Sequence, residues 1–172
     1  MPDATGLQLI AQQLEGSDQV GAGAVLDTLH YRNRAALTVD PERIVAVLEH
    51  LRASGYNFLA SVHGSDYYPE EPRLGVHYEL LDMTRVDRIS VLVRLHTDAP
   101  EVDSVTPHWP TADHPEREVY DMFGVVFRGH PDLRRILMPE DYEGHPQRRD
   151  FPIGGEPVLF THNDHHQLGS PE

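Results

Sequence analysis

The stretch EREVYDMFGVVFRGHPDLRRILMPEDYEGHPQRRDFP, residues 116–152, is the part of the chain around which the rest is organised. Its first dozen residues place apolar side chains at the i, i+3, i+4 and i+7 positions of a helix, namely Val119, Met122, Phe123 and Val126. This spacing predicts a short helix with one buried face. The helix should end near Gly124, because glycine readily adopts the left-handed conformation that closes a helix.

The charged residues of this helix allow more than one interpretation. Asp113 and Glu116 have the spacing of a capping box, which predicts the helix start. We expect Glu116, Arg117, Glu118 and Asp121 on the polar side of the helix. Arg117 and Asp121, four positions apart, indicate either a salt bridge within the helix or charges that face a partner chain. Glu116 and Glu118 do not face one another, so a solvated or arginine-paired surface is favoured over acid–base catalysis.

The second part of the stretch has no regular period. Prolines, each of which removes a backbone donor, recur at positions 131, 139, 146 and 152. Two arginine pairs, Arg134–Arg135 and Arg148–Arg149, stand among apolar side chains, namely Leu133, Ile136, Leu137, Met138, Tyr142 and Phe151. Apolar anchors beside arginines are typical of an interface core. We therefore interpret residues 128–172 as an extended arm that lies across another subunit, in preference to ordinary surface charge.

Composition excludes several classes of protein. A chain of 172 residues is long enough for one domain with its own core, followed by a tail. The formal net charge of −14 argues against binding to nucleic acid or to an anionic membrane surface. No window reaches the roughly 18 apolar residues of a membrane span. No signal peptide begins the chain, which predicts residence inside the cell.

The sequence contains no cysteine and no lysine. Without cysteine it cannot supply thiolate ligands to an iron–sulfur cluster, form disulfides or provide a thiol nucleophile. Without lysine it cannot form a Schiff base or a lysine-based phosphate loop. All 14 cationic side chains are therefore arginine, which binds carboxylates at two points and stays charged at an interface. This composition favours docking over catalysis.

Residues 1–110 are predicted to form an α+β domain. The pattern indicates a helix over residues 5–15 capped by Thr5, then a hairpin over residues 24–39 that turns at Arg32-Asn33. A second helix should start at Asp40-Pro41 and end at Gly55. Strands are expected at residues 57–66, 74–81 and 88–96.

This order of elements, helix, two strands, helix, three strands, predicts a two-layer sandwich. Both helices would pack on one face of the sheet, and the other face would be free for a partner. We expect residues 111–127 to form the short helix and a following apolar segment, and residues 128–172 to form the arm.

The histidines near the end of the chain suggest a different class of function. His162, His165 and His166 could chelate a metal ion and so make the chain a stand-alone metal-dependent enzyme. They stand in a polar terminal segment, where disorder is the common outcome, so we do not favour this hypothesis. The sequence marks no nucleophile elbow and no complete glycine-rich dinucleotide motif.

The quoted stretch resembles the signature of the C subunit, also called the thirty-kilodalton subunit, of NADH:quinone oxidoreductase, respiratory complex I. The resemblance is dense over residues 116–152 and weaker before them. The residues that carry it, with an implied role in fold integrity and assembly, are Glu116, Arg117, Glu118, Asp121, Gly124, His130, Pro131, Leu133, Arg134, Arg135, Gly144, His145, Pro146, Arg148, Arg149, Asp150 and Pro152.

The resemblance implies a non-catalytic subunit of the peripheral arm. Such a protein carries no cofactor of its own, while FMN, iron–sulfur clusters and quinone belong to partner subunits. Its implied partners are the D-type and B-type subunits that form the quinone chamber, on the cytoplasmic face of the inner or plasma membrane. An equivalent subunit of a membrane-bound hydrogenase, or of a ferredoxin- or F420-dependent relative, is an alternative that the sequence leaves open.

Overall fold

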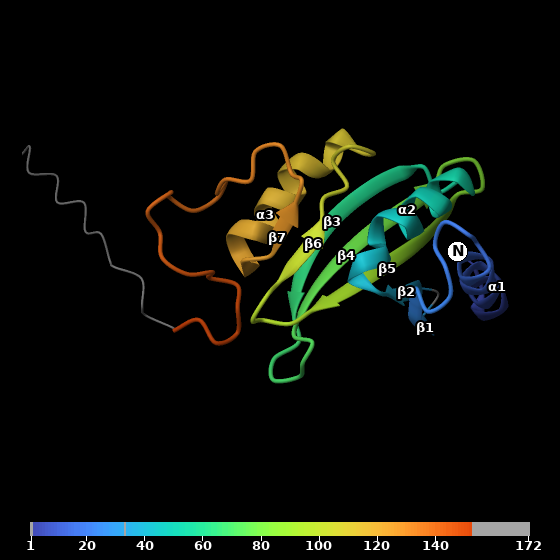
Figure 1. The fold of residues 1–172 in the computed structure, drawn as a ribbon, viewed down its shortest axis with the longest axis horizontal. Coiled ribbons are helices and arrows are strands. Elements are labelled where there is room, and N and C mark those ends of the chain that lie inside the picture. The colour runs from blue at the N-terminus through green and yellow to red at the C-terminus, as the bar shows by residue number, and fades with distance from the viewer. Residues whose placement is uncertain (1, 33, 153–172) are drawn as a thin grey trace, which may run out of the picture.

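Five strands pair into one mixed sheet in the order β1-β2-β5-β4-β3, in which β2 and β5 are parallel and the other neighbours antiparallel (Figure 1). The computed structural model describes residues 2–32 and 34–152. The strands of the sheet are β1 Val25–Tyr31, β2 Arg34–Val39, β3 Phe58–Asp66, β4 Leu74–Asp82 and β5 Asp87–Leu95. The helices are α1 Ala4–Glu15, η1 Pro41–Arg43, α2 Ile44–Ala53, η2 Pro110–Ala112 and α3 Asp113–Phe123. Two short parallel strands, β6 Glu101–Asp103 and β7 Val126–Arg128, form a second sheet.

Of the predicted α+β sandwich, the combination of helices with a β-sheet is confirmed, and two details of the helix starts are corrected. Asp3, not Thr5, caps α1, because its carboxylate accepts a hydrogen bond from the amide of Gly6. Asp40 caps the 3-10 turn η1, and the α-helix begins only at Ile44. Asn33 of the expected turn lies outside the described residues.

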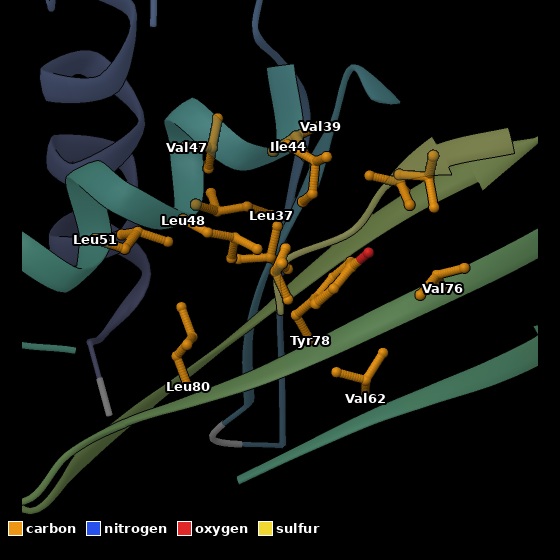
Figure 2. Packing of buried hydrophobic residues seen from close by; sticks show 14 of the residues in the cluster. Leu37, Val39, Ile44, Val47, Leu48, Leu51, Val62, Val76, Tyr78 and Leu80 are labelled. Carbon is orange, nitrogen blue, oxygen red and sulfur yellow. The ribbon is translucent and has the colours of Figure 1, made fainter. Parts of the chain in front are cut away.

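Alternation along the strands separates a core face from an open face. In β4 the core face carries Val76, Tyr78 and Leu80, each 0% exposed. Figure 2 shows these side chains beneath Leu48 and other apolar residues of α2. The alternate residues His77, Glu79 and Leu81 of the same strand are half-buried. Burial of such side chains contributes about 1.5–3 kcal/mol each, which makes this layer the main source of stability.

Helix α3 packs against β3, at the edge of the sheet opposite β1 (Figure 1). A Cβ atom at Gly64 of β3 would overlap the ring of Phe123. The absence of a side chain at Gly64 therefore lets the end of α3 approach the strand backbone. This contact sets the position of the helix from which the following segment starts. None of the helices in the described residues is long and apolar enough to cross a membrane.

Candidate functional site

Two acidic side chains of α3 are completely buried, which corrects the expectation that they lie on its polar side. Glu116 and Asp121 are both 0% exposed, whereas Glu118 is exposed as expected. A buried carboxylate is tolerated only when hydrogen-bond donors surround it. The donors to Glu116 and Asp121 come from segments that the helical periodicity cannot show.

Glu116 binds the segment that follows β6. Its Oε1 accepts a hydrogen bond from the amide of Val105 at 2.8 Å, and its Oε2 accepts one from Ser104 Oγ at 2.6 Å. Burial raises the pKa of Glu116 to about 7, although the donors Ser104 and Val105 oppose the shift. The expected capping box with Asp113 does not form, because Glu116 is engaged elsewhere and α3 has no side-chain cap.

Asp121 holds the segment 135–138 against α3. Its Oδ2 accepts hydrogen bonds from the amides of Ile136, Leu137 and Met138 at 2.7–3.0 Å. Its Oδ1 accepts one from Arg135 Nη1 at 2.7 Å. Burial alone would raise the pKa of this carboxyl, but the three amides and the guanidinium hold the pKa below its usual value. Asp121 is thus an ionised group whose four donors all come from one short segment.

Arg117 reaches the same segment from the preceding turn of α3. Its Nε donates to the carbonyl oxygen of Arg134 at 3.1 Å, and its Nη2 donates to that of Arg135 at 3.3 Å. Arg117 and Asp121 therefore do not form the salt bridge with each other that their spacing allowed. Each of the two side chains instead binds residues 134–138 of its own chain.

The carboxyl end of α3 is closed by residues 145–148. His145 Nδ1 lies 3.0 Å from the carbonyl oxygen of Asp121, the amide of Gln147 donates to Met122, and Arg148 Nε donates to Phe123 at 2.7 Å. The last carbonyls of a helix have no partner within it, so these contacts satisfy acceptors that would otherwise be lost.

Gly124 makes this closure possible. It has φ of 76°, the left-handed conformation predicted for the helix end, and a Cβ atom there would overlap His145 and Arg148. Gly144 contributes from the other side, since its carbonyl oxygen accepts from Arg135 Nη2 at 2.8 Å. Gly124, Gly144, His145, Arg148 and Asp121 therefore meet around the end of α3. We call these contacts, together with those of Arg117 and Arg135, the α3 clasp.

A second cluster fixes the end of the described chain. Arg73, only 6% exposed, donates to both carboxylate oxygens of Asp66 and to both of Asp150, at 2.6–2.8 Å. Hydrogen bonds from Arg73 lower the pKa of both carboxyls. The amide of Arg149 also donates to Asp66 at 2.7 Å. Residues 149–150 are therefore tied to the loop between β3 and β4.

The remaining signature residues lie around these clusters. The side chain of His130 is fully buried near the start of α3, with Nε2 3.2 Å from the carbonyl oxygen of Asp113. Arg134 is 64% exposed and pairs with Asp132. Leu133 and Pro146 are half-buried, and Pro131 and Pro152 are exposed. The structure thus gives Arg135, Arg148 and Arg149 partners within this chain, and leaves Arg134 at the surface.

Sequence reasoning missed three residues that complete these contacts, namely Asp66, Arg73 and Ser104. Arg73 and Asp66 lie more than seventy positions before Asp150 in the chain, so no local period links them. Ser104 stands in the linker before α3 and carries no motif. A single sequence offers no signal for such long-range pairs.

The arrangement holds a segment of the chain in place. Within residues 2–32 and 34–152, no three side chains of the metal-binding types His, Cys, Asp or Glu gather closely enough to hold an ion. His162, His165 and His166 lie outside the described residues.

Known proteins similar to this chain agree with one another. Residues 37–157 match the family described as respiratory-chain NADH dehydrogenase, 30 kDa subunit. The C subunit of NADH-quinone oxidoreductase from Roseiflexus sp. (strain RS-1) is 47% identical over 143 residues, covering 81% of this chain and 82% of that protein. NADH-quinone oxidoreductase subunit 5 from Thermus thermophilus is 45% identical over 128 residues, covering 69% of this chain and 62% of that protein.

Two solved structures share the fold. A trypsin-resistant fragment of Nqo5 is 31% identical, with a TM-score of 0.59, and the match covers 74% of this chain and 98% of that one. A chain from an archaeal membrane-bound sulfane sulfur reductase is 23% identical, with a TM-score of 0.69, covering 87% of this chain and 86% of that one. The family match, which spans most of the sheet, α3 and both clusters, includes every signature residue. The chain therefore belongs to the 30 kDa subunit family of respiratory-chain NADH dehydrogenase.

Proposed function

We propose that this chain is a non-catalytic peripheral-arm subunit of a proton-pumping NADH:quinone oxidoreductase, and that it supports assembly around the subunits that form the quinone site. Family membership over residues 37–157 supports the assignment of the chain to this enzyme complex. The chain's own contribution is structural, because its buried charges serve to hold a segment of chain and not to transform a substrate.

The α3 clasp is the observation that carries this proposal. Residues 129–152 contain no helix and no strand, yet they are fixed to the domain through Asp121 and the end of α3. Leu137 is 59% exposed and Arg134 is 64% exposed on this fixed segment. A segment held in one shape with an apolar and a cationic side chain turned to solvent is suited to docking at low entropic cost.

In this proposal the partners are the D-type and B-type subunits. FMN, iron–sulfur clusters and quinone are carried by partner subunits, and for the clusters this agrees with the lack of cysteine ligands in this chain. The complex lies on the cytoplasmic face of the inner or plasma membrane, which this chain contacts only through its partners. Residues 1–110 form the domain, residues 111–127 the signature helix and its apolar extension, and residues 128–172 the interaction arm.

Purification from the native membrane tests the proposal. The chain is tagged, extracted in mild detergent, and the co-purifying proteins are identified by mass spectrometry. We expect D-type and B-type subunits in stoichiometric amounts. Elution of the chain alone, from membranes that contain the assembled complex, would contradict the proposal.

The electron donor needs a separate experiment, because the same fold occurs in an archaeal membrane-bound sulfane sulfur reductase. The co-purified complex is assayed with NADH, with reduced ferredoxin and with reduced F420, using quinone as acceptor, and hydrogen evolution is measured in parallel. NADH oxidation coupled to quinone reduction is expected. Activity only with ferredoxin or F420, or evolution of hydrogen, would assign the chain to a relative of complex I.

A further inference from the structure

The face of the sheet opposite the core carries a hollow of about 540 Å³. Every residue that lines it comes from strands β1 to β5, and the lining residues of β4 and β5 alternate with those that face the core. Ser90 of β5 and Ala36 of β2 lie in register at its floor. No helix of the described chain contributes to the lining, so this face of the sheet is open.

The lining of the hollow has a charge opposite to that of the whole chain. Acidic residues outnumber basic ones by 28 to 14 in the sequence. The hollow, in contrast, is lined by Arg34 and Arg88 against one acid, Glu79. Arg94 lies on the same face, because Ser90, Leu92 and Arg94 are alternate residues of β5. Arg94 is in register with Gly75 of β4. Within the described residues, none of these three arginines forms an ion pair with a carboxylate.

Arg94 is the most unusual of the three. Its guanidinium stacks 4.1 Å from the centre of the Tyr67 ring, and its Nε and Nη2 atoms are buried without a hydrogen-bond partner in the described chain. His77 does not add to the charge: its ring stacks on that of His63 at 4.8 Å, and burial lowers the pKa of His77 to about 4. The charge that Arg34, Arg88 and Arg94 supply is independent of pH near neutrality, because guanidinium groups stay protonated.

Two exposed apolar side chains lie at the edge of the hollow. Leu29 and Tyr31 of the edge strand β1 are 59% and 60% exposed, and they lie in register with Ala36 and Arg34 on the open face. Exposed apolar side chains beside unpaired arginines form the usual composition of a protein interface core. An edge strand can also pair with an added chain.

We propose that this open face binds an extended acidic segment of another polypeptide of the same complex. Carboxylates of that segment would pair with Arg34, Arg88 and Arg94, and its apolar side chains would pack on Leu29 and Tyr31. The inference rests on the proposed assembly function and adds a second docking surface, on the side of the domain away from α3. The chain then contacts its partners through two faces.

Cross-linking within the assembled complex tests the location. The photo-reactive residue p-benzoylphenylalanine is placed at Tyr31 of the full chain, the native membranes are irradiated, and the cross-linked peptides are identified. We expect a product with another subunit, in a segment that contains Asp or Glu. Cross-links to a second copy of this chain, to its own residues 153–172, or to no protein at all would each overturn the inference.

A charge reversal tests the chemistry. Arg88→Glu should lower the amount of chain retained in the purified complex about tenfold, an effect equivalent to about 1.4 kcal/mol of binding free energy. Arg43→Glu is the matched control, since Arg43 is also exposed, has no ion pair in the described chain, and precedes α2 outside the hollow. A compensating Glu→Arg change at the cross-linked partner position should restore retention.

Failure of the proposed assembly function can be distinguished from failure of this inference. If the unsubstituted chain elutes alone, the proposed assembly function fails and this inference fails with it. If the unsubstituted chain co-purifies with its partners but Arg88→Glu behaves like Arg43→Glu, only the acidic docking partner is refuted. Circular dichroism of both variants checks that the domain remains folded.

Discussion

The sheet domain and the segment after α3 are held together by different kinds of interaction. The sheet buries a continuous apolar layer between its core face and α2, with Tyr78, Leu48 and Leu37 almost inaccessible to solvent (Figure 2). Residues 129–152 bury few apolar side chains and depend on charged groups, chiefly Asp121 and Arg73, which bind backbone or opposite charges. Apolar packing gives the domain its stability, and a few directional bonds give the segment its shape.

This difference predicts how each region fails. Loss of a core side chain should lower the stability of the whole domain, because packing is shared among many neighbours. Loss of a clasp residue should release one segment and leave the sheet intact, because the lost bonds belong to that segment alone. The following substitutions test this distinction, in order of decreasing expected effect.

Leu48→Ala should have the largest effect. Leu48 is 0% exposed between α2 and the sheet, and removing a buried leucine side chain leaves a cavity that costs about 4 kcal/mol. Urea denaturation followed by circular dichroism should show one transition at a lower midpoint. Leu26→Ala, at a site 62% exposed, is the control and should change little. Equal behaviour of the two variants would disprove the assignment of the core.

Asp121→Ala should release the segment 135–148 at a cost of about 3 kcal/mol, because Arg135 would lose its carboxylate partner and three amides would lose their acceptor. Limited trypsin digestion should then cleave at Arg134 and Arg135 much faster, while hydrogen exchange in β4 stays slow. Glu118→Ala, on the exposed side of the same helix, is the control. Simultaneous loss of protection in β4 would show that clasp and sheet form one cooperative unit.

Glu116→Gln should change the pH dependence of stability. The pKa of Glu116 is raised to about 7 from an unfolded value near 4.5, so between these pH values the folded chain binds a proton that the unfolded chain has released. The contribution of Glu116 to the free energy of unfolding is therefore largest at low pH and falls as the pH rises. The unsubstituted chain should lose about 2 kcal/mol relative to Glu116→Gln between pH 5 and pH 7.

The pH dependence of stability is compared between the unsubstituted chain and Glu116→Gln because His77 changes stability with pH in the opposite direction. Burial lowers the pKa of His77 to about 4, so its contribution grows as pH rises towards 6.5. This contribution is common to both proteins and cancels in the difference. Glu118→Gln is the control for removal of a carboxylate. A constant difference between the unsubstituted chain and Glu116→Gln from pH 5 to pH 7 would show that Glu116 has an ordinary pKa.

Arg134→Ala should have the smallest effect on the isolated chain. Arg134 is 64% exposed and pairs with Asp132, an exposed contact that contributes little. The thermal midpoint should stay unchanged, while incorporation into the purified complex falls, because the proposed docking segment presents Arg134 to a partner. Arg148→Ala, which loses the donor to the carbonyl of Phe123, should lower both. A lower thermal midpoint for Arg134→Ala would instead indicate an internal structural role.

The local parts of this structure could be predicted from sequence, because their causes are local. Periodicity and glycine chemistry located α3 and its end at Gly124, and alternating side chains located the strands of the sheet. The same reasoning misplaced Glu116 and Asp121. A carboxylate on a helix is assigned to solvent unless its donors are known, and these donors are the amides of residues 105 and 136–138.

The types of residue in the site could be predicted from the sequence, whereas the contacts that they form could not. The arginines and prolines of residues 128–152 led to the prediction of an extended arm that lies across another subunit, and contact with another subunit stays a prediction. Part of the surface that this segment contacts is α3 and the loop containing Arg73, in the same chain. Long-range pairs of this kind depend on the tertiary fold, which a local pattern of residues does not encode.

The closure of α3 by residues 145–148 has a consequence for the order of events in the cell. The acceptors for His145, Gln147 and Arg148 are helix-end carbonyls, which exist in this arrangement only after α3 has formed and packed on β3. The shaped segment is therefore a property of the finished fold. A partner that recognises this shape would bind folded copies of the protein and not unfolded ones.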